Sequence, residues 1–377
     1  MKNILVTGGA GFIGSRLSLE LVGKGYVVTV LDNLLQQVHG ENPEADSPLY
    51  KSIVGQVRFI KGDVVNTEDW ENALVGQDII VHLAAETGTG QSMYEIGKHS
   101  EVNVSGTAKM LDLLVNNQHK IKKVIVASSR AVYGEGKYSH PHLGVVFPPS
   151  RKVESMMIRE FEMKHEDGQN LTPVPTDETS KINPISIYGI TKYTQEQMVM
   201  LSCSSIGVPA VSLRFQNVYG EGQSLANPYT GILSIFSTQI LNGEEINVFE
   251  DGKESRDFIH VEDVVSAILM SIENEAANGE VFNIGTGVST SVKEVAETLA
   301  SAYGKQVPIK ISGLFRVGDI RHNFADTSKA QKILGFNPKI TFKEGISKFT
   351  SWVSAQSVST IRVSDSLNEM KSKGLLK

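Results

Sequence analysis

A glycine-rich turn near the start of the chain constrains the fold more than any other feature of the sequence. A short apolar run predicts a buried strand, TGGAGFIG follows at once, and a helical pattern begins at Phe12. This order places Gly8, Gly11 and Gly14 at three-residue spacing between a strand and a helix. Glycines there permit a tight turn, a close approach of the backbone to a pyrophosphate, and close packing of the helix on the sheet. The motif therefore predicts a dinucleotide-binding βαβ unit.

The rest of the first half repeats the alternation of short β-branched runs with helical patterns. Such alternation is typical of a parallel sheet with crossover helices. We expect strands at residues 2–7, 26–31, 57–60, 78–82, 123–127 and 210–214. We expect helices at residues 12–22, 68–74, 101–116 and 186–203. The predicted fold class is therefore α/β, with a Rossmann-type doubly wound parallel sheet.

A smaller α/β domain, for substrate binding, is expected after Phe215, where the pattern becomes irregular and rich in Gly, Asn and Pro. Residues 256–261 and 281–284 again look like buried strands, so the two parts should interleave. We assign residues 1–214 and 257–285 to the first domain, and residues 215–256 and 286–377 to the second. The tail at 364–376 reads as a short charged helix.

Two polar insertions interrupt this scheme, at residues 36–56 and 137–180. Both are rich in turn-forming residues and predict loops with some helix. Long loops in a compact domain are often functional. Because the second insertion lies between two motifs of the candidate active site, we expect it to face the substrate.

Composition excludes several other classes of protein. Of 377 residues, 40% are hydrophobic, and no apolar run approaches the roughly 18–20 residues that cross a bilayer. The N-terminus lacks the pattern of a signal peptide, so we expect a cytoplasmic protein with no membrane partner. One cysteine, Cys203, excludes an internal disulfide and a cysteine zinc site, and we predict no metal site. With 36 basic and 42 acidic residues, the net charge is −6, and nucleic acid is not an expected partner.

Residues at the ends of later strands suggest the cofactor. Asp32 follows Gly14 by 18 residues, at the end of the second strand, where a carboxylate can accept both hydroxyls of an adenosine ribose. The same charge repels a 2′-phosphate, which favours NAD over NADP. Asp63 follows the third strand and can meet the adenine amino group; its other interpretation is a turn residue. The fourth strand ends in HLAA, where we expect His82 to be a packed core histidine.

A tyrosine and a lysine form the candidate catalytic pair. Tyr188 and Lys192 are spaced i and i+4 on a predicted helix and therefore share one face. A nearby ammonium favours the tyrosinate, which would make Tyr188 a general base. The fifth strand ends in Ser128 and Ser129, whose hydroxyls could hydrogen-bond a substrate alcohol or ketone. Without the other motifs, these serines would be interpreted as capping residues.

At this point the chain resembles the extended short-chain dehydrogenases/reductases of the nucleotide-sugar epimerase/dehydratase family. The resemblance runs from the first strand to about residue 350 and rests on ordered motifs: TGGAGFIG, DN, GDV, HLAA, NVSGT, SSRAVYG, YGITK, RFQNVYG, RDFIHVEDV, FNIGTG and RVGDIRH. It implies the catalytic residues Ser129, Tyr188 and Lys192. It also implies NAD contacts from Gly8, Gly11, Phe12, Ile13, Gly14, Asp32, Asn33, Asp63, Val64, Leu83, Ala84, Ala85, Asn103, Ser128, Tyr188, Lys192 and Phe215.

The resemblance further implies that the partner is a nucleotide-diphosphate sugar. Asn217, Arg256 and Arg316 are expected at the diphosphate, which agrees with the fit of a guanidinium fork to phosphate oxygens. The other alternative for either arginine is a surface ion pair. The full set of expected substrate residues is Gly88, Thr89, Gln91, Ser129, Arg130, Tyr188, Asn217, Arg256, Arg316 and Asp319.

The residues after Ser129 indicate which of the family's reactions to expect for this chain. Dehydratases of the family carry an Asp-Glu pair there, whereas this chain has Arg130 and Ala131, so elimination lacks its proton carriers. A 4-epimerase remains, with no net redox change, and the motifs are most similar to the dTDP-L-rhamnose 4-epimerase subgroup, which implies dTDP-6-deoxy-L-talose as the product. The alternatives are a 6-deoxy-4-ketohexose reductase, a UDP-hexose 4-epimerase and, from another class, an NAD-binding sensor. The resemblance also implies a homodimer through the helices that begin near residues 101 and 186.

Overall fold

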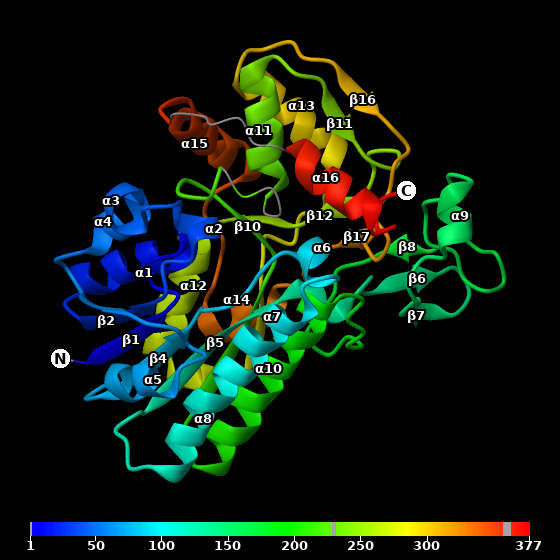
Figure 1. Cartoon of the computed structure of the whole chain (residues 1–377). Helices are drawn as coiled ribbons and strands as arrows, with labels where there is room; N and C mark the ends of the chain where they lie inside the picture. Colours follow the sequence, from blue (N-terminus) through cyan, green and yellow to red (C-terminus); the bar gives the residue numbers. More distant parts are fainter. Residues whose placement is uncertain (1, 226, 228–230, 357–362) are drawn as a thin grey trace.

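A parallel sheet of seven strands forms the centre of the protein (Figure 1). The structure is a computed structural model that describes residues 2–225, 227, 231–356 and 363–377. In spatial order the strands are β14 (Val281–Ile284), β9 (Ala210–Phe215), β5 (Lys123–Ser129), β4 (Ile79–His82), β1 (Asn3–Thr7), β2 (Val27–Asp32) and β3 (Arg58–Lys61). Each strand pairs in parallel with its neighbours, and the expected α/β fold is confirmed.

The chain order of the strands reverses direction at β1. Strand β1 pairs with β2 on one side and with β4 on the other, so the loops that follow β1 and β4 leave toward opposite faces of the sheet. In open α/β sheets, ligands bind at this switch point, outside the carboxyl ends of the strands. The six strands expected in the first part of the chain begin and end within two residues of those observed, and the buried strand expected at 281–284 forms the seventh, β14.

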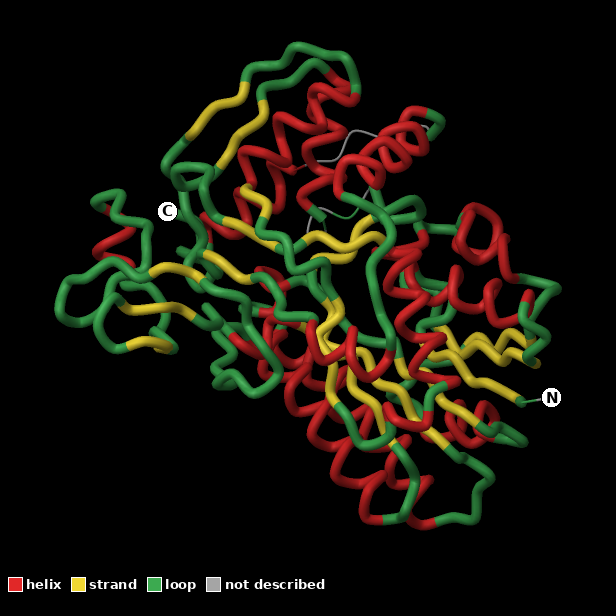
Figure 2. Tube along the Cα trace, turned by 180° about the vertical axis from the view of Figure 1, so that it is seen from behind, coloured by secondary structure: helices red, strands yellow, loops and turns green. Residues whose placement is uncertain are grey.

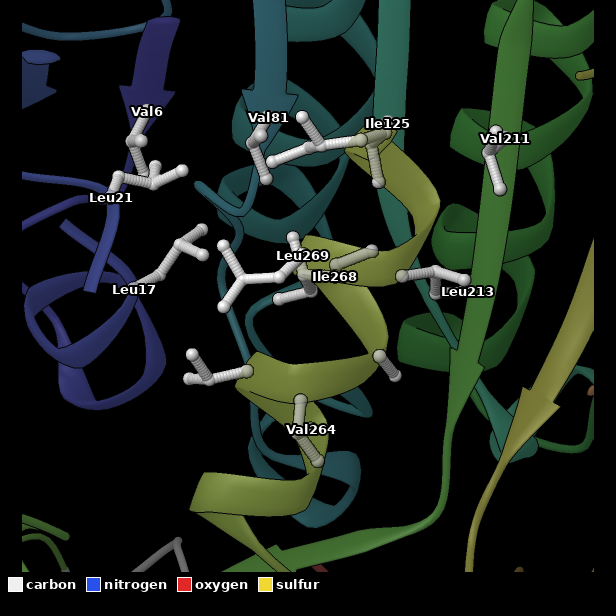
Figure 3. Packing of buried hydrophobic residues seen from close by; sticks show 14 of the residues in the cluster. Val6, Leu17, Leu21, Val81, Ile125, Val211, Leu213, Val264, Ile268 and Leu269 are labelled. Carbon is white, nitrogen blue, oxygen red and sulfur yellow. The ribbon is translucent and has the colours of Figure 1, made fainter. Parts of the chain in front are cut away.

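Helices cover both faces of the sheet (Figure 1). On one face lie α1 (Phe12–Gly23), α12 (Val261–Glu273) and α14 (Ser328–Leu334), which share an apolar core with β1, β4, β5 and β9. Figure 3 shows Val264, Ile268 and Leu269 of α12 pointing toward side chains of these strands. On the other face lie α5 (Thr67–Leu74), α8 (Gly106–Asn116) and α10 (Ile187–Ser205). Cys203 is buried in this second core, and burial raises the pKa of its thiol to about 11.

Helix α8 is reached through a change in helical pitch. The chain runs from α7 (Ile96–Ser100) through a π-helical turn at Glu101–Ser105 and then into α8. The sequence predicted one uninterrupted helix here. Turns of π-helix inside longer helices often occur near functional sites, and this one carries Asn103 on its buried side.

A smaller group of elements lies beyond the carboxyl ends of the strands, at the top of Figure 1. Its apolar core is formed by α11 (Ile232–Asn242), α13 (Val292–Ala302), α15 (Phe342–Ser354) and the parallel strands β11 (Ile246–Val248) and β16 (Ile309–Ile311). The tail contains α16 (Val363–Ser372), which agrees with the expected helix. After α16, Leu375 and Lys377 exchange backbone hydrogen bonds with Phe315 and Val317 on either side of Arg316.

Residues 256–261 differ from the expectation that they form a strand of the main sheet. They contain two short strands, β12 (Ser255–Arg256) and β13 (Phe258–His260), separated at Asp257. Strand β12 joins β15 (Thr290–Ser291) and β17 (His322–Asn323), whereas β13 pairs with β10 (Asn217–Tyr219). The reason is Asp257, whose carboxylate accepts the backbone N–H groups of Thr286 and Gly287 and bends the chain away from the main sheet.

The two insertions are more ordered than the sequence indicated. The first contains α2 (Gln36–His39), α3 (Pro43–Asp46) and α4 (Pro48–Ile53). The second remains mainly loop with one short helix, α9 (Val153–Met157), as expected, but it also contains a small antiparallel sheet of β6 (Tyr138–His140), β7 (Gly144–Val146) and β8 (Thr172–Pro173). Figure 2 shows this sheet projecting from the body of the molecule. Ion pairs hold it there, including Arg151 with Glu250 at 2.8 Å.

A histidine cluster closes the end of this small sheet. The side-chain ligand atoms of His140, His165 and Asp167 lie within 4.8 Å of one another. His140 Nδ1, however, accepts the backbone N–H groups of His142 and Leu143, each at 3.1 Å. A neutral ring then carries its proton on Nε2, which donates to Asp167 at 3.0 Å. Both ring nitrogens of His140 are therefore used in hydrogen bonds within the protein, which fits a structural contact better than a metal site.

The remaining short elements are α6 (Thr89–Ser92) after β4, a 3₁₀ turn at Arg130–Tyr133 after β5, and a second 3₁₀ turn at Glu275–Ala277 after α12. Within the described residues, every helix is too short or too polar to cross a membrane.

Candidate active site

One cavity of about 660 Å³ runs from the glycine turn of β1 to the smaller group of elements. It opens at the switch point of the sheet, where the strand order predicts a ligand site. Its walls contain all the expected site residues except Asn103 and Gln91. The expected residues that line it are Gly8, Gly11, Phe12, Ile13, Gly14, Asp32, Asn33, Asp63, Val64, Leu83, Ala84, Ala85, Gly88, Thr89, Ser128, Ser129, Arg130, Tyr188, Lys192, Phe215, Asn217, Arg256, Arg316 and Asp319.

The glycine turn leaves no room for side chains. Gly8 has φ +67°, and a Cβ built on it would lie 2.8 Å from the backbone nitrogen of Ala84. A Cβ on Gly14 would lie 2.2 Å from the carbonyl oxygen of Gly8. Helix α1 begins directly after Gly11, and no side chain caps its N-terminus. Its first N–H groups therefore remain available to an anion, as a dinucleotide pyrophosphate requires.

Asp32 occupies the position expected for a ribose-binding carboxylate. Its Oδ2 accepts the N–H of Ala10 in the glycine turn at 2.9 Å, and its Oδ1 accepts the N–H of Leu34 at 2.8 Å. Burial raises the pKa of Asp32, and these two N–H groups act in the opposite direction. His39 Nε2 lies 3.9 Å from Asp32 Oδ1, and the cavity reaches both residues. The first insertion thus contributes a residue that sequence reasoning missed, because nothing in the local pattern connects His39 to β2.

Asp63 lies next to Asn33 at the same end of the cavity. The Asn33 side-chain amide donates to Asp63 Oδ2 at 2.9 Å, and Asp63 Oδ1 accepts the N–H of Val65 at 3.1 Å. Asp63 thus makes a turn contact and also lines the cavity, and its contact with an adenine amino group stays a prediction. These residues and the glycine turn form a polar end that fits an adenosine.

Two expected contact residues lie behind the cavity wall. Asn103 is fully buried, where its side chain accepts the N–H of Glu86 at 2.8 Å and donates to the Glu86 carbonyl and to Thr191. It thereby fixes the loop after β4 against α10. Gln91 bonds to Gln37 of the first insertion at 3.1 Å and to Glu95. Both residues position the walls of the cavity.

Ser129, Tyr188 and Lys192 converge at the middle of the cavity. Ser129 ends β5 and caps the following 3₁₀ turn, where its Oγ accepts the N–H of Ala131 at 3.2 Å. Tyr188 lies in the first turn of α10, and its N–H donates to Ser92 at 3.0 Å. Lys192 follows one turn later, where its Nζ donates to Gln195. The predicted catalytic residues are thus adjacent and come from two elements.

Burial dominates the titration of these groups. It raises the pKa of Tyr188, which a hydrogen bond from Ser129 and the charge of Arg130 lower. It also lowers the pKa of Lys192 to about 7. The sequence predicted that Lys192 lowers the tyrosine pKa, whereas in this structure Arg130 is the cation with that effect. A lysine that titrates near neutral pH is suited to proton transfer, whereas a phenol with a raised pKa needs a nearby positive charge to act as a base.

Three arginines line the next part of the cavity. Arg256 pairs with Asp319 at 3.0 Å, and the Arg316 guanidinium lies 5.1 Å above the Phe249 ring. Arg130 donates from Nε to Asn217 at 2.6 Å. The Nε atom of Arg316 and the Nη1 atom of Arg130 are buried without a hydrogen-bond partner among the described residues. Unpartnered guanidinium N–H groups in a cavity suit the oxygens of a diphosphate.

Several lining residues were not predicted from the sequence. Gln216, beside Asn217, has both amide atoms buried without a partner among the described residues. Glu250 and Glu254 lie at the far end. Glu250 binds Arg151 and Arg321, and burial raises the pKa of Glu254 to about 8. Gln216 could have been found, since RFQNVYG already contains it; the two glutamates become lining residues only through contacts distant in sequence.

Two other expectations concern residues outside the cavity. His82 is fully buried, bonds to Thr7 at 2.7 Å and to Thr107 at 3.0 Å, and has its pKa lowered to about 3 by burial. It is a packed core histidine, as predicted. No residue of 137–180 lines the cavity of the described structure, so the expected substrate-facing position of the second insertion is wrong. The insertion instead contacts the outside of the wall through Arg151.

Comparison with known proteins identifies the group to which this arrangement belongs. Residues 4–152 and 165–285 match the NAD dependent epimerase/dehydratase family. The chain belongs to this family. It is 36% identical to a dTDP-L-rhamnose 4-epimerase from Burkholderia thailandensis over 357 residues, which cover 94% of this chain and 96% of the relative. The expected family, fold class, enzyme class and cofactor are thereby confirmed.

Solved structures of the family share the whole architecture. UDP-glucose 4-epimerase from Thermotoga maritima, determined with UDP-glucose, has a TM-score of 0.74 and 31% identity, and the match covers 93% of this chain and 98% of that one. UDP-glucose 4-epimerase from Thermus thermophilus, determined with NAD, has a TM-score of 0.73 and 26% identity, and the match covers 94% and 100%.

Proposed function

We propose that the protein is a nucleotide-sugar 4-epimerase that interconverts dTDP-L-rhamnose and dTDP-6-deoxy-L-talose. The observation that carries the reaction is the continuity of one cavity. It joins the polar end around Asp32 to Ser129 and Tyr188, and then to Arg256 and Arg316. A dinucleotide, a hexose carbon and a diphosphate can therefore occupy neighbouring parts of the same space.

The residues of the cavity divide into three roles. Tyr188 removes the proton of the hexose C4 hydroxyl, and Ser129 hydrogen-bonds the same oxygen. Lys192, one turn later on α10, can exchange a proton near neutral pH, while Arg256 and Arg316 bind the diphosphate. Bound NAD supplies a reversible hydride acceptor at C4. Tyr188 and Ser129 then return the proton to the oxygen after the hexose has presented its other face.

The cofactor contacts follow from the fit described above. The N-terminus of α1 and the turn at Gly8, Gly11 and Gly14 hold the pyrophosphate. Asp32 accepts hydrogen bonds from the adenosine ribose and repels a 2′-phosphate. Asn33 and Asp63 lie at the adenine end. Asn103, which the sequence placed among the NAD contacts, supports the loop after β4 in this assignment.

One observation supports epimerisation over the dehydratase reaction of the family. The residues directly after Ser129 are Arg130 and Ala131, so no carboxylate stands at the positions that dehydratases use. A reductase exchanges its cofactor in each turnover, whereas an epimerase regenerates it and needs no second nucleotide. The hexose assignment rests on the 36% identity to the Burkholderia thailandensis enzyme over nearly the whole chain. The second candidate is a UDP-hexose 4-epimerase, which the 31% identity to the Thermotoga maritima structure favours.

We also propose that the protein forms a homodimer. Leu201 of α10 and Val115 of α8 are 74% and 49% exposed, which supports pairing of two copies through these helices. Met110 and Leu114 of α8 are buried in the core and do not contribute to this surface. We further propose a cytoplasmic location and the domain division expected from the sequence, with residues 1–214 and 257–285 in the first domain and residues 215–256 and 286–377 in the second. Light scattering on purified protein tests the dimer.

The test of the function is an incubation without added cofactor. Purified protein that carries NAD should convert dTDP-L-rhamnose to a mixture of two isomers of equal mass. UDP-glucose and UDP-galactose in parallel reactions distinguish the second candidate. A product two mass units from the substrate, or a requirement for stoichiometric NADH, would reject the epimerase. Turnover of the UDP-hexoses alone would reject the rhamnose assignment.

A further inference from the structure

Arg130 belongs to the SSRAVYG motif and to the expected substrate residues, but neither assigns it a particular contact. It begins the 3₁₀ turn directly after the catalytic Ser129, so its backbone is fixed by the end of β5 and by the Ser129 cap. Its Nε donates to Asn217 Oδ1 at 2.6 Å, which sets the direction of the guanidinium plane. The Nη1 atom is buried and has no hydrogen-bond partner among the described residues. The side chain is thus held in place with donors that the protein leaves unused.

Arg130 follows Ser129 in the chain and contacts Asn217, and all three residues line the cavity. Tyr188, Arg256 and Asp319 are close enough to act electrostatically on the guanidinium. Burial and Arg256 lower the pKa of Arg130 to about 9, so the group remains charged at neutral pH. A diphosphate held by Arg256 would therefore lie near Arg130, because the two guanidinium groups interact electrostatically.

The acidic groups that act electrostatically on Arg130 are Asp319 and Asp257, and both have other partners; Asp257 accepts the backbone N–H groups of Thr286 and Gly287. Asp319 pairs with Arg256 at 3.0 Å, and Glu250 is bound by Arg151 and Arg321. Glu254, with its pKa raised to about 8, is largely uncharged at pH 7. The charge of Arg130 is therefore left for a ligand. A planar guanidinium with two terminal N–H groups matches two phosphate oxygens better than it matches one hydroxyl.

The proposed reaction also requires a fixed point on the diphosphate. Inversion at C4 needs the hexose to present both faces to Tyr188, so strong contacts to the hexose itself would hinder its turning. Strong contacts to the phosphate that carries the hexose would not. We propose that Arg130 binds this glycosyl-side phosphate, opposite Arg256 and Arg316, and holds it as the pivot about which the hexose turns. This inference rests on the proposed function, which it makes more specific.

The test compares ligands that differ by one phosphate. The NAD-bound enzyme and the variants Arg130→Met and Arg130→Lys are titrated calorimetrically with dTDP, dTMP, UDP and UMP. We expect Arg130→Met to weaken binding of the diphosphates about 10- to 100-fold, the effect of losing a charge-assisted hydrogen-bond pair. Binding of the monophosphates should change by less than about threefold on the same reasoning. Arg130→Lys should recover part of the loss, because it keeps the charge with fewer fixed donors.

The controls separate binding from folding. Arg58→Met changes an exposed arginine on β3 and should leave every affinity unaltered. The NAD content and the thermal midpoint of each variant report on folding, and Arg130→Lys retains the charge of the native residue if the methionine variant fails to fold. Unchanged diphosphate affinity in both Arg130 variants would overturn the inference. A loss confined to the complete nucleotide sugar would indicate a hexose contact, and a shift confined to the pH profile of turnover would indicate an effect on Tyr188; each would also overturn it.

These measurements do not depend on turnover. If the wild-type enzyme bound dTDP through Arg130 but formed no C4 isomer of any sugar nucleotide, the proposed reaction would fail while the phosphate contact stood. If the wild type epimerised its substrate but the variants bound diphosphates normally, the reaction would stand and the pivot would fail.

Discussion

The substitution Gly14→Ala tests the cofactor site at the level of single atoms. A Cβ at this position would lie 2.2 Å from the carbonyl oxygen of Gly8 and 2.6 Å from Gly9 Cα. Non-bonded heavy atoms are stable near 3.5 Å, so helix α1 and the turn would have to separate by about 1 Å. Such overpacking costs about 1–3 kcal/mol of stability. The movement also carries the first N–H groups of α1 away from the pyrophosphate.

Gly23 offers a matched control in the same helix. A Cβ built there meets no atom within 4 Å, and alanine is a better helix former than glycine by up to about 1 kcal/mol. We expect Gly14→Ala to lower NAD affinity at least about 10-fold for each charge-assisted hydrogen bond lost. Gly23→Ala should bind NAD normally with an equal or slightly higher thermal midpoint. NAD content by chromatography and calorimetric affinity provide the assay, and wild-type NAD binding by Gly14→Ala would refute the reasoning.

Three further predictions concern stability and the walls of the cavity. Arg214→Met leaves Glu196 buried without its partner at 2.6 Å. The variant should lose about 3–5 kcal/mol of unfolding free energy in chemical denaturation, and the double variant with Glu196→Leu should recover most of it. Equal stabilities of the single and double variants would contradict this prediction. Glu254 has an ordinary pKa of 4.5 and a folded pKa of about 8, so the folded protein holds a proton that the unfolded chain releases. Wild-type stability should therefore fall as pH rises through this window, and Glu254→Gln should reduce that slope by up to about 1.4 kcal/mol per pH unit; parallel stability curves would disprove the assignment. Ending the chain at Gly374 removes the backbone bonds that Leu375 and Lys377 make around Arg316, and should raise the Kd for nucleotide sugar several-fold at unchanged NAD affinity, as measured by calorimetry; a loss of NAD affinity instead would mean that the tail serves another site.

The central sheet could be predicted from the sequence because each of its strands carries its own signal. Runs such as NILVT and KVIVA are continuous and apolar, and the burial of both faces of a parallel sheet requires such runs. The end of β12 and the start of β13 could not be predicted, since the bend between them depends on Asp257 and its contact with Thr286.

The second insertion shows what local patterns omit. Its strands are two or three residues long, which is too short for an alternation to be visible. Its position depends on ion pairs between residues far apart in the chain, such as Arg151 with Glu250 at 2.8 Å. The insertion consequently lies outside the cavity, although its neighbours in sequence are active-site motifs.

A position at the cavity could be predicted where a motif carries both the turn and the candidate side chain. Gly8, Asp32, Ser129 and Tyr188 all lie at or beside the end of a strand or the start of a helix, and all line the cavity. Gln91 differs, because its place in the fold is decided by hydrogen bonds to Gln37 and Glu95. The sequence does not distinguish a polar loop residue that contacts a ligand from one that only supports the wall of the cavity.

The measurement that tests the central claim most directly uses dTDP-L-rhamnose labelled with deuterium at C4. The NAD-bound enzyme is incubated with this substrate in ordinary water without added cofactor, and the product is analysed by mass spectrometry and NMR. Transient oxidation at C4 with return of the same hydride predicts dTDP-6-deoxy-L-talose of unchanged mass, with deuterium still at C4. Loss of the label to solvent would contradict the account. A labelled substrate that stays unchanged with wild-type protein, as it would with Tyr188→Phe, would also contradict it.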